Sequence, residues 1–289
     1  MEKIIVEVGS TSTKIDLYDG KKIKNLALEV IEFKYNYRKA NKLDENDVER
    51  LISKIIELKK KYQEIYVCRT SIFRTLDDEQ KEGFLKEFYS KTGINFEIID
   101  QEKENELTVK GAVKKVNGKV AVFVGGGGST EIAIYDNGIK EMVNTSMGVA
   151  DIMNKYPNLA EDLATTDLEE IKIAIKEKLN LPKQKADTLI LAGGGHLLFA
   201  LNSGITYKKN ELYNDELQPF MMDIETRKKD TERYYKEISL DGIRQRVEDP
   251  SWWYATRAMS AFVLVVAEEI GAKYIVPTDI SMVYGMIDN

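Results

Sequence analysis

Two short turns rich in glycine, serine and threonine carry the residue types that bind phosphate. The first turn reads GSTST at residues 9–13, and the second reads GGGST at residues 126–130. Glycine exposes successive backbone N–H groups, and the hydroxyls add further donors that can converge on phosphate oxygens. The candidate phosphate-binding residues are Gly9, Ser10, Thr11, Ser12, Thr13, Gly126, Gly127, Gly128, Ser129 and Thr130.

These turns belong to a longer segment that occurs twice, at residues 6–20 and 123–138. The identical pairs share one offset of 117 (126 − 9): Gly9/Gly126, Ser12/Ser129, Thr13/Thr130, Ile15/Ile132, Tyr18/Tyr135 and Asp19/Asp136. Each copy predicts an apolar strand, a turn and an alternating strand, and ends at an Asp-Gly or Asp-Asn-Gly hairpin signal. The repeat indicates two related domains, and a chance likeness between two hairpins is the alternative.

The rest of the chain alternates between strand and helix patterns, which is typical of α/β domains. In the first half we expect strands at residues 22–33, 64–68 and 95–99, and helices at 45–62, 78–91 and 102–116. In the second half we expect strands at 120–124, 130–135, 139–144, 188–192 and 274–276, and helices at 149–156, 168–179, 255–270 and 280–287, with another after the glycines at 193–195. Residues 207–236 read as helices and surface loops. Asn117-Gly118 is a turn signal, so we predict domains at 1–117 and 118–289.

Composition excludes several classes of function. Among the 289 residues Cys68 is the only cysteine and His196 the only histidine, which excludes an internal disulfide framework and a Cys/His metal cluster within the chain. The formal charge of −6 argues against a DNA-coating surface. No run of eighteen apolar residues occurs, so we expect no membrane segment and a cytoplasmic protein. Cys68 is expected to be a small buried residue on a strand.

Four segments resemble the Ppx/GppA family of exopolyphosphatases and guanosine pentaphosphate phosphohydrolases. EVGSTSTKIDLY at residues 7–18 resembles the first phosphate motif of the family, and GGGSTE at 126–131 matches the second. RTSIFR at 69–74 and EIIDQEKENELTVKGA at 97–112 are also similar to family segments. The resemblance spans nearly the whole chain. It implies two ribonuclease-H-like, actin-like α/β domains of the acetate kinase/Hsp70/actin superfamily, with an interdomain cleft, in the short two-domain form.

The resemblance also implies roles for individual residues. Glu104 would activate water, and Arg74 would hold phosphate oxygens with its guanidinium fork. Glu131 would be a further catalytic acid, and with Glu7 it would hold Mg²⁺ or another divalent cation. Judged from residue type alone, Glu104 is an ordinary helix-surface acid and Arg74 one half of a surface ion pair.

The chain departs from the family pattern at several charged positions. Glu7 replaces an aspartate, Val124 stands where the second motif has an aspartate, and Asp151 stands where an arginine is expected. Residues 282–285 lack the usual Leu-Arg-Glu-Gly pattern. These changes weaken the inference that long polyphosphate is the preferred substrate.

Three functional hypotheses follow. The first is a hydrolase that releases terminal phosphate from polyphosphate or guanosine pentaphosphate. The second is a non-catalytic sensor of phosphate or alarmone, and the third is an ATP-dependent small-molecule kinase of the same fold. The resemblance also suggests a homodimer, to which Trp252, Trp253 and Tyr254 could contribute, although burial within the chain is the alternative.

Overall fold

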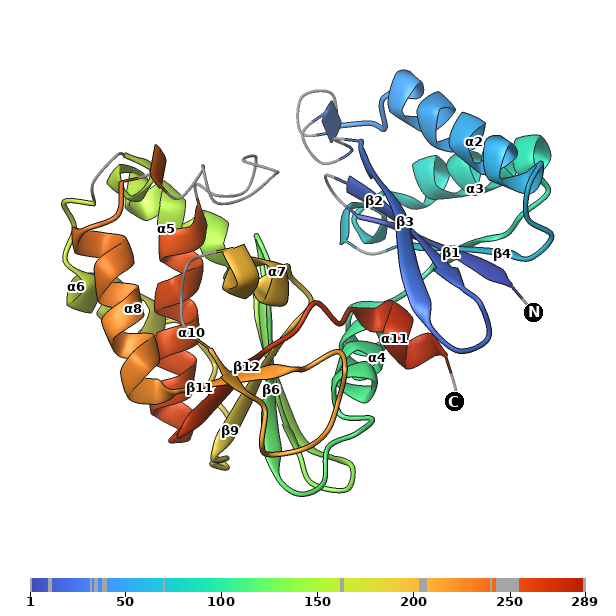
Figure 1. Cartoon of the computed structure of the whole chain (residues 1–289). Coiled ribbons are helices and arrows are strands. Elements are labelled where there is room, and N and C mark those ends of the chain that lie inside the picture. Colours follow the sequence, from blue (N-terminus) through green and yellow to red (C-terminus); the bar gives the residue numbers. More distant parts are fainter. Residues whose placement is uncertain are drawn as a thin grey trace. The chain divides into compact units, whose positions relative to one another are not determined.

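Packing divides the computed structural model into two units, Met1–Glu106 with Ile287–Asn289, and Leu107–Met286 (Figure 1). The division falls within helix α4 (Gln101–Ala112), before the turn from which we predicted a boundary at residues 117 and 118. The structure describes residues 2–9, 12–31, 33, 36–37, 41–69, 71–161, 164–202, 207–239, 241–242 and 255–287. The aromatic residues 252–254 lie outside this part, so their place stays a prediction.

The first unit contains a five-stranded sheet in the order β3-β2-β1-β4-β5. Its elements along the chain are β1 (Lys3–Val8), β2 (Ser12–Tyr18), β3 (Ile23–Val30), α2 (Glu45–Lys59), β4 (Ile65–Arg69), the 3₁₀ helix η1 (Ser71–Arg74), α3 (Asp78–Thr92), β5 (Phe96–Ile98) and the start of α4. Strands β1, β2 and β3 pair antiparallel, whereas β1, β4 and β5 pair parallel. The helical connections after β3 and β4 are those that parallel strands require.

One face of this sheet is apolar. Ile4, Val6 and Val8 alternate along β1 and pack in one buried cluster with residues of α2 and α3, such as Leu51 and Phe88. Successive side chains of a strand point to opposite faces, so the residues between them point to the other face. That second face carries the charged residues described below.

The second unit contains a seven-stranded sheet in the order β10-β11-β12-β9-β6-β7-β8. Its elements are β6 (Val120–Gly125), β7 (Thr130–Tyr135), β8 (Ile139–Thr145), α5 (Val149–Lys155), the 3₁₀ helix η2 (Pro157–Ala160), α6 (Leu168–Lys176), β9 (Thr188–Ala192), α7 (His196–Asn202), β10 (Lys208–Lys209), β11 (Phe220–Asp223), α8 (Ile224–Lys236), α10 (Thr256–Ile270), β12 (Tyr274–Pro277) and α11 (Met282–Met286). Strands β12-β9-β6-β7-β8 repeat the order of the first sheet, so each unit has the same five-stranded frame.

The register of the hairpins confirms the duplication. In the first hairpin Val8 pairs with Thr13, and in the second Gly125 pairs with Thr130, a shift of 117 for both partners (125 − 8 and 130 − 13). Three antiparallel strands followed by two parallel ones, in both units, form the two-part ribonuclease-H-like α/β fold that we predicted. The cleft expected between the units stays a prediction.

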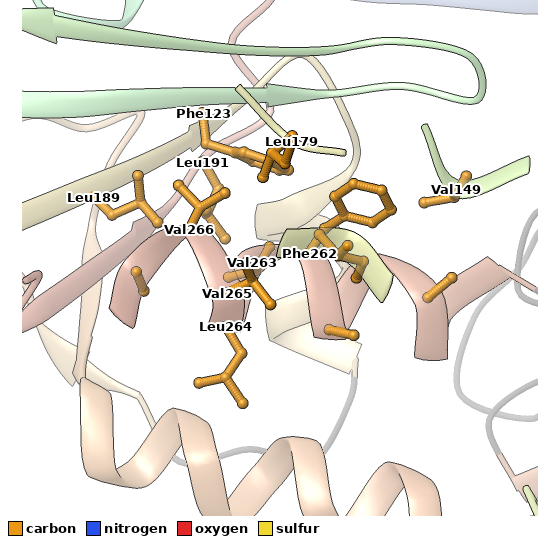
Figure 2. Close-up of a cluster of buried hydrophobic side chains, with 14 of the residues drawn as sticks. Phe123, Val149, Leu179, Leu189, Leu191, Phe262, Val263, Leu264, Val265 and Val266 are labelled. Atoms are coloured by element: carbon orange, nitrogen blue, oxygen red, sulfur yellow. The ribbon is translucent and has the colours of Figure 1, made fainter. Parts of the chain in front are cut away.

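Helix α10 forms the centre of the second unit's larger core. Phe123 and Leu191 point from the sheet toward Phe262, Val263 and Val266 of the helix, while other residues of α10 point away from the strands (Figure 2). The helix is buried on nearly all sides because α5, α6 and α8 also pack against it (Figure 1). On the opposite face of the sheet, residues from the second half of α4 pack against the strands.

Most of the predicted elements are confirmed within one to three residues at their ends, but one prediction is wrong. Residues 207–236 contain strands β10 and β11 besides helix α8, where we expected helices and loops. β11 pairs antiparallel with β12, which lies far away in sequence. A four-residue strand formed by such a distant partner leaves no local pattern. In the described part of the chain, no helix has both the length and the apolar character needed to cross a membrane.

Candidate functional site

The turn between β1 and β2 contains the first group of predicted phosphate-binding residues. Gly9 follows β1, Ser12 begins β2, and residues 10 and 11 lie outside the described part. Thr13 is fully buried, and no described residue forms a hydrogen bond with its hydroxyl oxygen. Its pairing with Val8 gives it the orientation of the apolar face.

Glu7 on β1 ends in a buried carboxylate oxygen. The strand register sets Glu7 beside Lys14 of β2 and Cys68 of β4, on the polar face of the first sheet. Its Oε2 is shielded from solvent and has no hydrogen-bond partner among the described residues. A buried carboxylate oxygen is costly unless it meets a donor or a cation, so this atom suits a cation.

Two more titratable residues, Asp16 and Cys68, lie on the polar face of the first sheet. Asp16 accepts a hydrogen bond of 3.0 Å from Asn25 Nδ2. Burial raises the pKa of Asp16, the Asn25 bond lowers it, and the charge of Glu7 raises it further. Cys68 is buried on its strand, as predicted. Burial, with the charges of Glu7 and Glu97, raises the pKa of its thiol, so Cys68 stays protonated and is no thiolate nucleophile.

Arg74 ends the short helix η1, which the apolar core holds in place. The preceding residue, Phe73, is fully buried. Its ring lies 5.0 Å from the rings of Phe33 and Phe84, measured between centroids. Since Phe73 fixes this short helix in the core, the backbone of Arg74 has a defined position beyond the carboxyl end of β4.

The guanidinium of Arg74 binds three acceptors at the start of α4. Nη1 donates to Glu104 Oε2 at 2.8 Å and to the backbone oxygen of Ile99 at 3.0 Å. Nη2 donates to Gln101 Oε1 at 2.9 Å. The ion pair is partly open to solvent, since the Arg74 side chain is 20% exposed and that of Glu104 is 25% exposed. Two residues that we predicted to act together are therefore in direct contact.

Opposing influences act on the proton affinity of Glu104. Burial is the largest and raises the pKa of its carboxyl group, while the hydrogen bond and charge of Arg74 lower it. Glu7 raises the pKa and Lys14 lowers it by smaller amounts. The outcome is a raised pKa, which strengthens Glu104 as a base while Arg74 favours its ionised form.

The glycine turn of the second unit is held by the start of α5. Gly126 N donates to Ser129 O at 2.9 Å across the turn. Val149 N donates to Gly126 O at 3.1 Å, and Ala150 N donates to Gly127 O at 2.9 Å. The carbonyl groups of Gly126 and Gly127 thus accept hydrogen bonds from the start of α5. The N–H groups of Gly127 and Gly128 donate no hydrogen bond within the described residues.

Gly148 and Asp151 complete this arrangement. A Cβ atom at Gly148 would lie 2.4 Å from Gly126 O and 2.6 Å from Gly128 N, so only glycine allows the two segments to approach this closely. Asp151 Oδ2 accepts the Gly148 N–H at 2.9 Å and caps α5. Asp151 therefore has a structural task at the position where we expected an arginine.

Two other predicted positions differ in character from their counterparts in the first copy. Glu131 on β7 is buried at 4% exposure and corresponds to Lys14 (131 − 117). Val124 corresponds to Glu7 (124 − 117), and its side chain packs against Gly193, where an added Cβ would lie 2.6 Å from Val124 Cγ1. The second copy thus has an aliphatic side chain where the first has a carboxylate.

The structure brings Arg74, Glu104 and Glu7 to the polar side of the first unit. Glu131 and the glycine turn belong to the second unit, and any joint action of the two groups stays a prediction. Sequence analysis missed Gln101 and Asp16. Alternation along β2 could have indicated Asp16, which lies two residues beyond Lys14 and so points to the same face.

The metal site stays a prediction. Among the described residues, no three His, Cys, Asp or Glu side chains form a group that could hold a metal ion. Mg²⁺ is commonly held by one or two carboxylates together with substrate phosphates and water, so a complete protein cage is not required. The unpartnered oxygen of Glu7 fits such a ligand.

The fold and these residues define a class: a two-unit α/β protein with glycine turns suited to phosphate and an arginine bound to a carboxylate. Comparisons with known proteins narrow the class. The model of the Ppx/GppA phosphatase family matches residues 4–246, so the chain belongs to that family. This membership supports a phosphatase function in the broad sense. No curated protein sequence matches the chain.

Solved structures agree with the fold. The type II variant of the Aquifex aeolicus Ppx/GppA phosphatase is 19% identical, with a TM-score of 0.77 over 99% of this chain and 98% of that one. An exopolyphosphatase from Cytophaga hutchinsonii is 14% identical, with a TM-score of 0.72 over 99% of this chain and 96% of that one. At these identities the likeness establishes the fold.

Proposed function

We propose that the protein is a phosphoanhydride hydrolase that releases terminal phosphate from inorganic polyphosphate or guanosine pentaphosphate. The contact between Arg74 Nη1 and Glu104 Oε2 at 2.8 Å carries the proposal. It joins a group that binds phosphate oxygens to a group that can accept a proton from water. Family membership supports the same reaction class.

Arg74 and Glu104 have complementary roles in this mechanism. The guanidinium holds oxygens of the terminal phosphate, and the adjacent carboxylate orients the attacking water and takes its proton. Because burial raises the pKa of Glu104, its conjugate base is stronger than that of an exposed glutamate. Activity should fall as the pH drops through that raised pKa, since the protonated carboxyl group cannot accept a proton.

The glycine turn supplies donors for the phosphate chain. The N–H groups of Gly127 and Gly128 form no hydrogen bond within the described residues. Backbone donors of this kind are fixed before the substrate arrives, so little reorganisation accompanies binding. Ser129 and the equivalent Ser12 of the first turn are proposed as further ligands. The Thr130 hydroxyl donates to Met147 O at 2.8 Å and Thr13 is fully buried, so neither threonine is proposed to bind phosphate through its side chain.

Glu7 is proposed to bind Mg²⁺ through its unpartnered Oε2, with Glu131 predicted as a second ligand. When bound, the ion would neutralise charge on the phosphate oxygens. Arg74 and Glu104 carry out the binding and proton-transfer roles described above.

Replacing Glu104 with glutamine tests the role of the base. Glutamine keeps the size and an acceptor oxygen but cannot take a proton at neutral pH, so Glu104→Gln should lower phosphate release at least ~100-fold. Glu102→Gln is the matched control, because Glu102 is an exposed acid of the same helix. Unchanged turnover in the Glu104 variant, with both proteins folded, would remove Glu104 from the mechanism.

A sensor of phosphate or alarmone is the second candidate, and Val124 is the observation that favours it. A valine packed against Gly193 provides no oxygen ligand at the position where the family motif has an aspartate. An assay of phosphate release with Mg²⁺ and polyphosphate, guanosine pentaphosphate or ATP separates the hypotheses. Tight binding of one compound without turnover of any supports the sensor, and phosphoryl transfer from ATP to a small acceptor supports the kinase.

A further inference from the structure

Three hydrogen bonds hold the guanidinium of Arg74 in place. A guanidinium has five N–H donors in one plane, and three of them are used by Ile99 O, Gln101 Oε1 and Glu104 Oε2. Within the described residues the other two donors have no acceptor, which leaves them for an incoming anion. The direction in which those two point depends on the three bonds that fix the plane.

The three acceptors differ in charge and in what else they do. Glu104 is charged and is the base of the proposed reaction, and Ile99 contributes a backbone oxygen. Gln101 is a neutral side chain three residues before Glu104, so the two lie one turn apart on the same side of α4. Gln101 can therefore orient the guanidinium without neutralising it and without taking part in proton transfer.

We infer that Gln101 is a positioning residue, which holds the guanidinium of Arg74 so that its remaining N–H donors face the substrate's phosphate. The inference rests on the proposed function and deepens it. The Gln101 bond is the only one of the three that involves Nη2, so it fixes the rotation of the fork at the end opposite Nη1. Without it the guanidinium can turn about its bonds to Nη1, and the directions of its two remaining N–H donors are no longer fixed.

Binding of inorganic tripolyphosphate in EDTA, measured by calorimetry, tests this inference without turnover. Gln101→Leu should weaken binding about tenfold, the effect of losing one hydrogen bond of about 1.4 kcal/mol. Gln80→Leu is the matched control, because Gln80 is a glutamine of the same unit whose side chain binds Asn41 and Asp77 instead. Its affinity should equal that of the unmodified protein.

A double-mutant cycle shows whether Gln101 acts through Arg74. In an Arg74→Ala background, Gln101→Leu should change the affinity by less than about twofold, because the group that it positions is gone. In turnover assays, Gln101→Leu should raise KM about tenfold and change kcat by less than about threefold. A purely structural role would give the same loss in both backgrounds.

The outcomes separate the inference from the proposed function. Tripolyphosphate binding that Gln101→Leu leaves intact, or weakens equally in the Arg74→Ala background, overturns the positioning role and leaves the hydrolase proposal standing. If the unmodified protein binds no tripolyphosphate in EDTA but turns over a substrate with Mg²⁺, the KM comparison decides the inference. If it neither binds tripolyphosphate nor releases phosphate from any of the compounds named above with Mg²⁺, the proposed function fails, and the inference fails with it.

Discussion

His196, the single histidine, begins α7 in the second unit. In the part of the chain that the structure describes, its Nε2 is shielded from solvent and has no hydrogen-bond partner. Burial, helped by the positive charge of Arg227, lowers the pKa of His196 to about 4. The imidazole is therefore neutral at physiological pH, and protonating it would place a second positive charge beside a buried arginine.

This environment predicts a loss of stability in mild acid. The folded pKa lies below the unfolded value of about 6.5, so between those values the unfolded state binds more protons. The free energy of unfolding should therefore keep its full value above pH 6.5 and fall as the pH drops toward 4. Between pH 7 and pH 5 the unmodified protein should lose about 2 kcal/mol more than His196→Gln. Urea unfolding at both pH values measures the difference, and equal losses would contradict the assignment.

Single residues also mark where sequence reasoning stops. Glu102, Glu104 and Glu106 are alike as helix-surface acids, and family resemblance alone distinguished Glu104. In the structure Glu104 binds Arg74, while Glu106 lies 3.4 Å from Lys103 at the surface. Arg74 precedes its partner by thirty positions (104 − 74), a separation that no local pattern reveals. Gln101 was missed because a glutamine at a helix start carries no chemical signal of its own.

At the scale of elements, the contact between the glycine turn and the start of α5 allows another test. Gly148→Ala would force a methyl group into the backbone of residues 126–128, since the nearest oxygen would be 2.4 Å away. The turn must shift, so we expect a loss of about 1–3 kcal/mol in stability and weaker binding of phosphate substrates.

Gly83→Ala is the matched control for that substitution. Gly83 lies within α3, and an added Cβ would meet nothing within 4 Å. Alanine should stabilise this helix by roughly 0.5–1 kcal/mol and leave substrate binding unchanged. Thermal unfolding and KM of both variants provide the comparison. Equal KM values would show that the turn tolerates displacement and does not bind substrate closely.

Elements differ in how well their sequences predict them. Long periodic helices such as α2 and α10, and alternating strands such as β7, follow from local pattern, because burial on one face or on all sides selects their residues. β10 and β11 do not, since their short segments become strands through partners distant in the chain. The docking of α5 behind the glycine turn was also unpredictable, because it depends on the absence of a side chain at Gly148.

At the scale of the whole molecule, the two copies share the same strand order and register but differ in their charged side chains. Both units keep the same strand order and hairpin register. On corresponding positions of β1/β2 and β6/β7, Glu7 and Asp16 of the first copy are replaced by Val124 and Ala133 of the second. The backbone register follows from the repeated turns and alternation, whereas each exposed or buried charge can change independently of the frame. For this reason the fold was readily predicted from sequence, whereas the different charges at corresponding positions of the two copies were not.

This asymmetry predicts how the two copies contribute to cation binding. Glu7→Gln should raise the Mg²⁺ concentration for half-maximal phosphate release several-fold, because it removes the charge of the carboxylate whose Oε2 has no partner among the described residues. Val124→Asp should lower that concentration by adding a carboxylate where the family motif has one, although a polar group packed against Gly193 should reduce stability by about 1–3 kcal/mol. Val124→Asn has the same shape and a similar effect on stability but no charge, so it isolates the electrostatic part. If the aspartate and asparagine variants respond identically to Mg²⁺, position 124 does not face the cation. Positions 7 and 124, although they correspond in the two copies, would then differ in their contribution to cation binding.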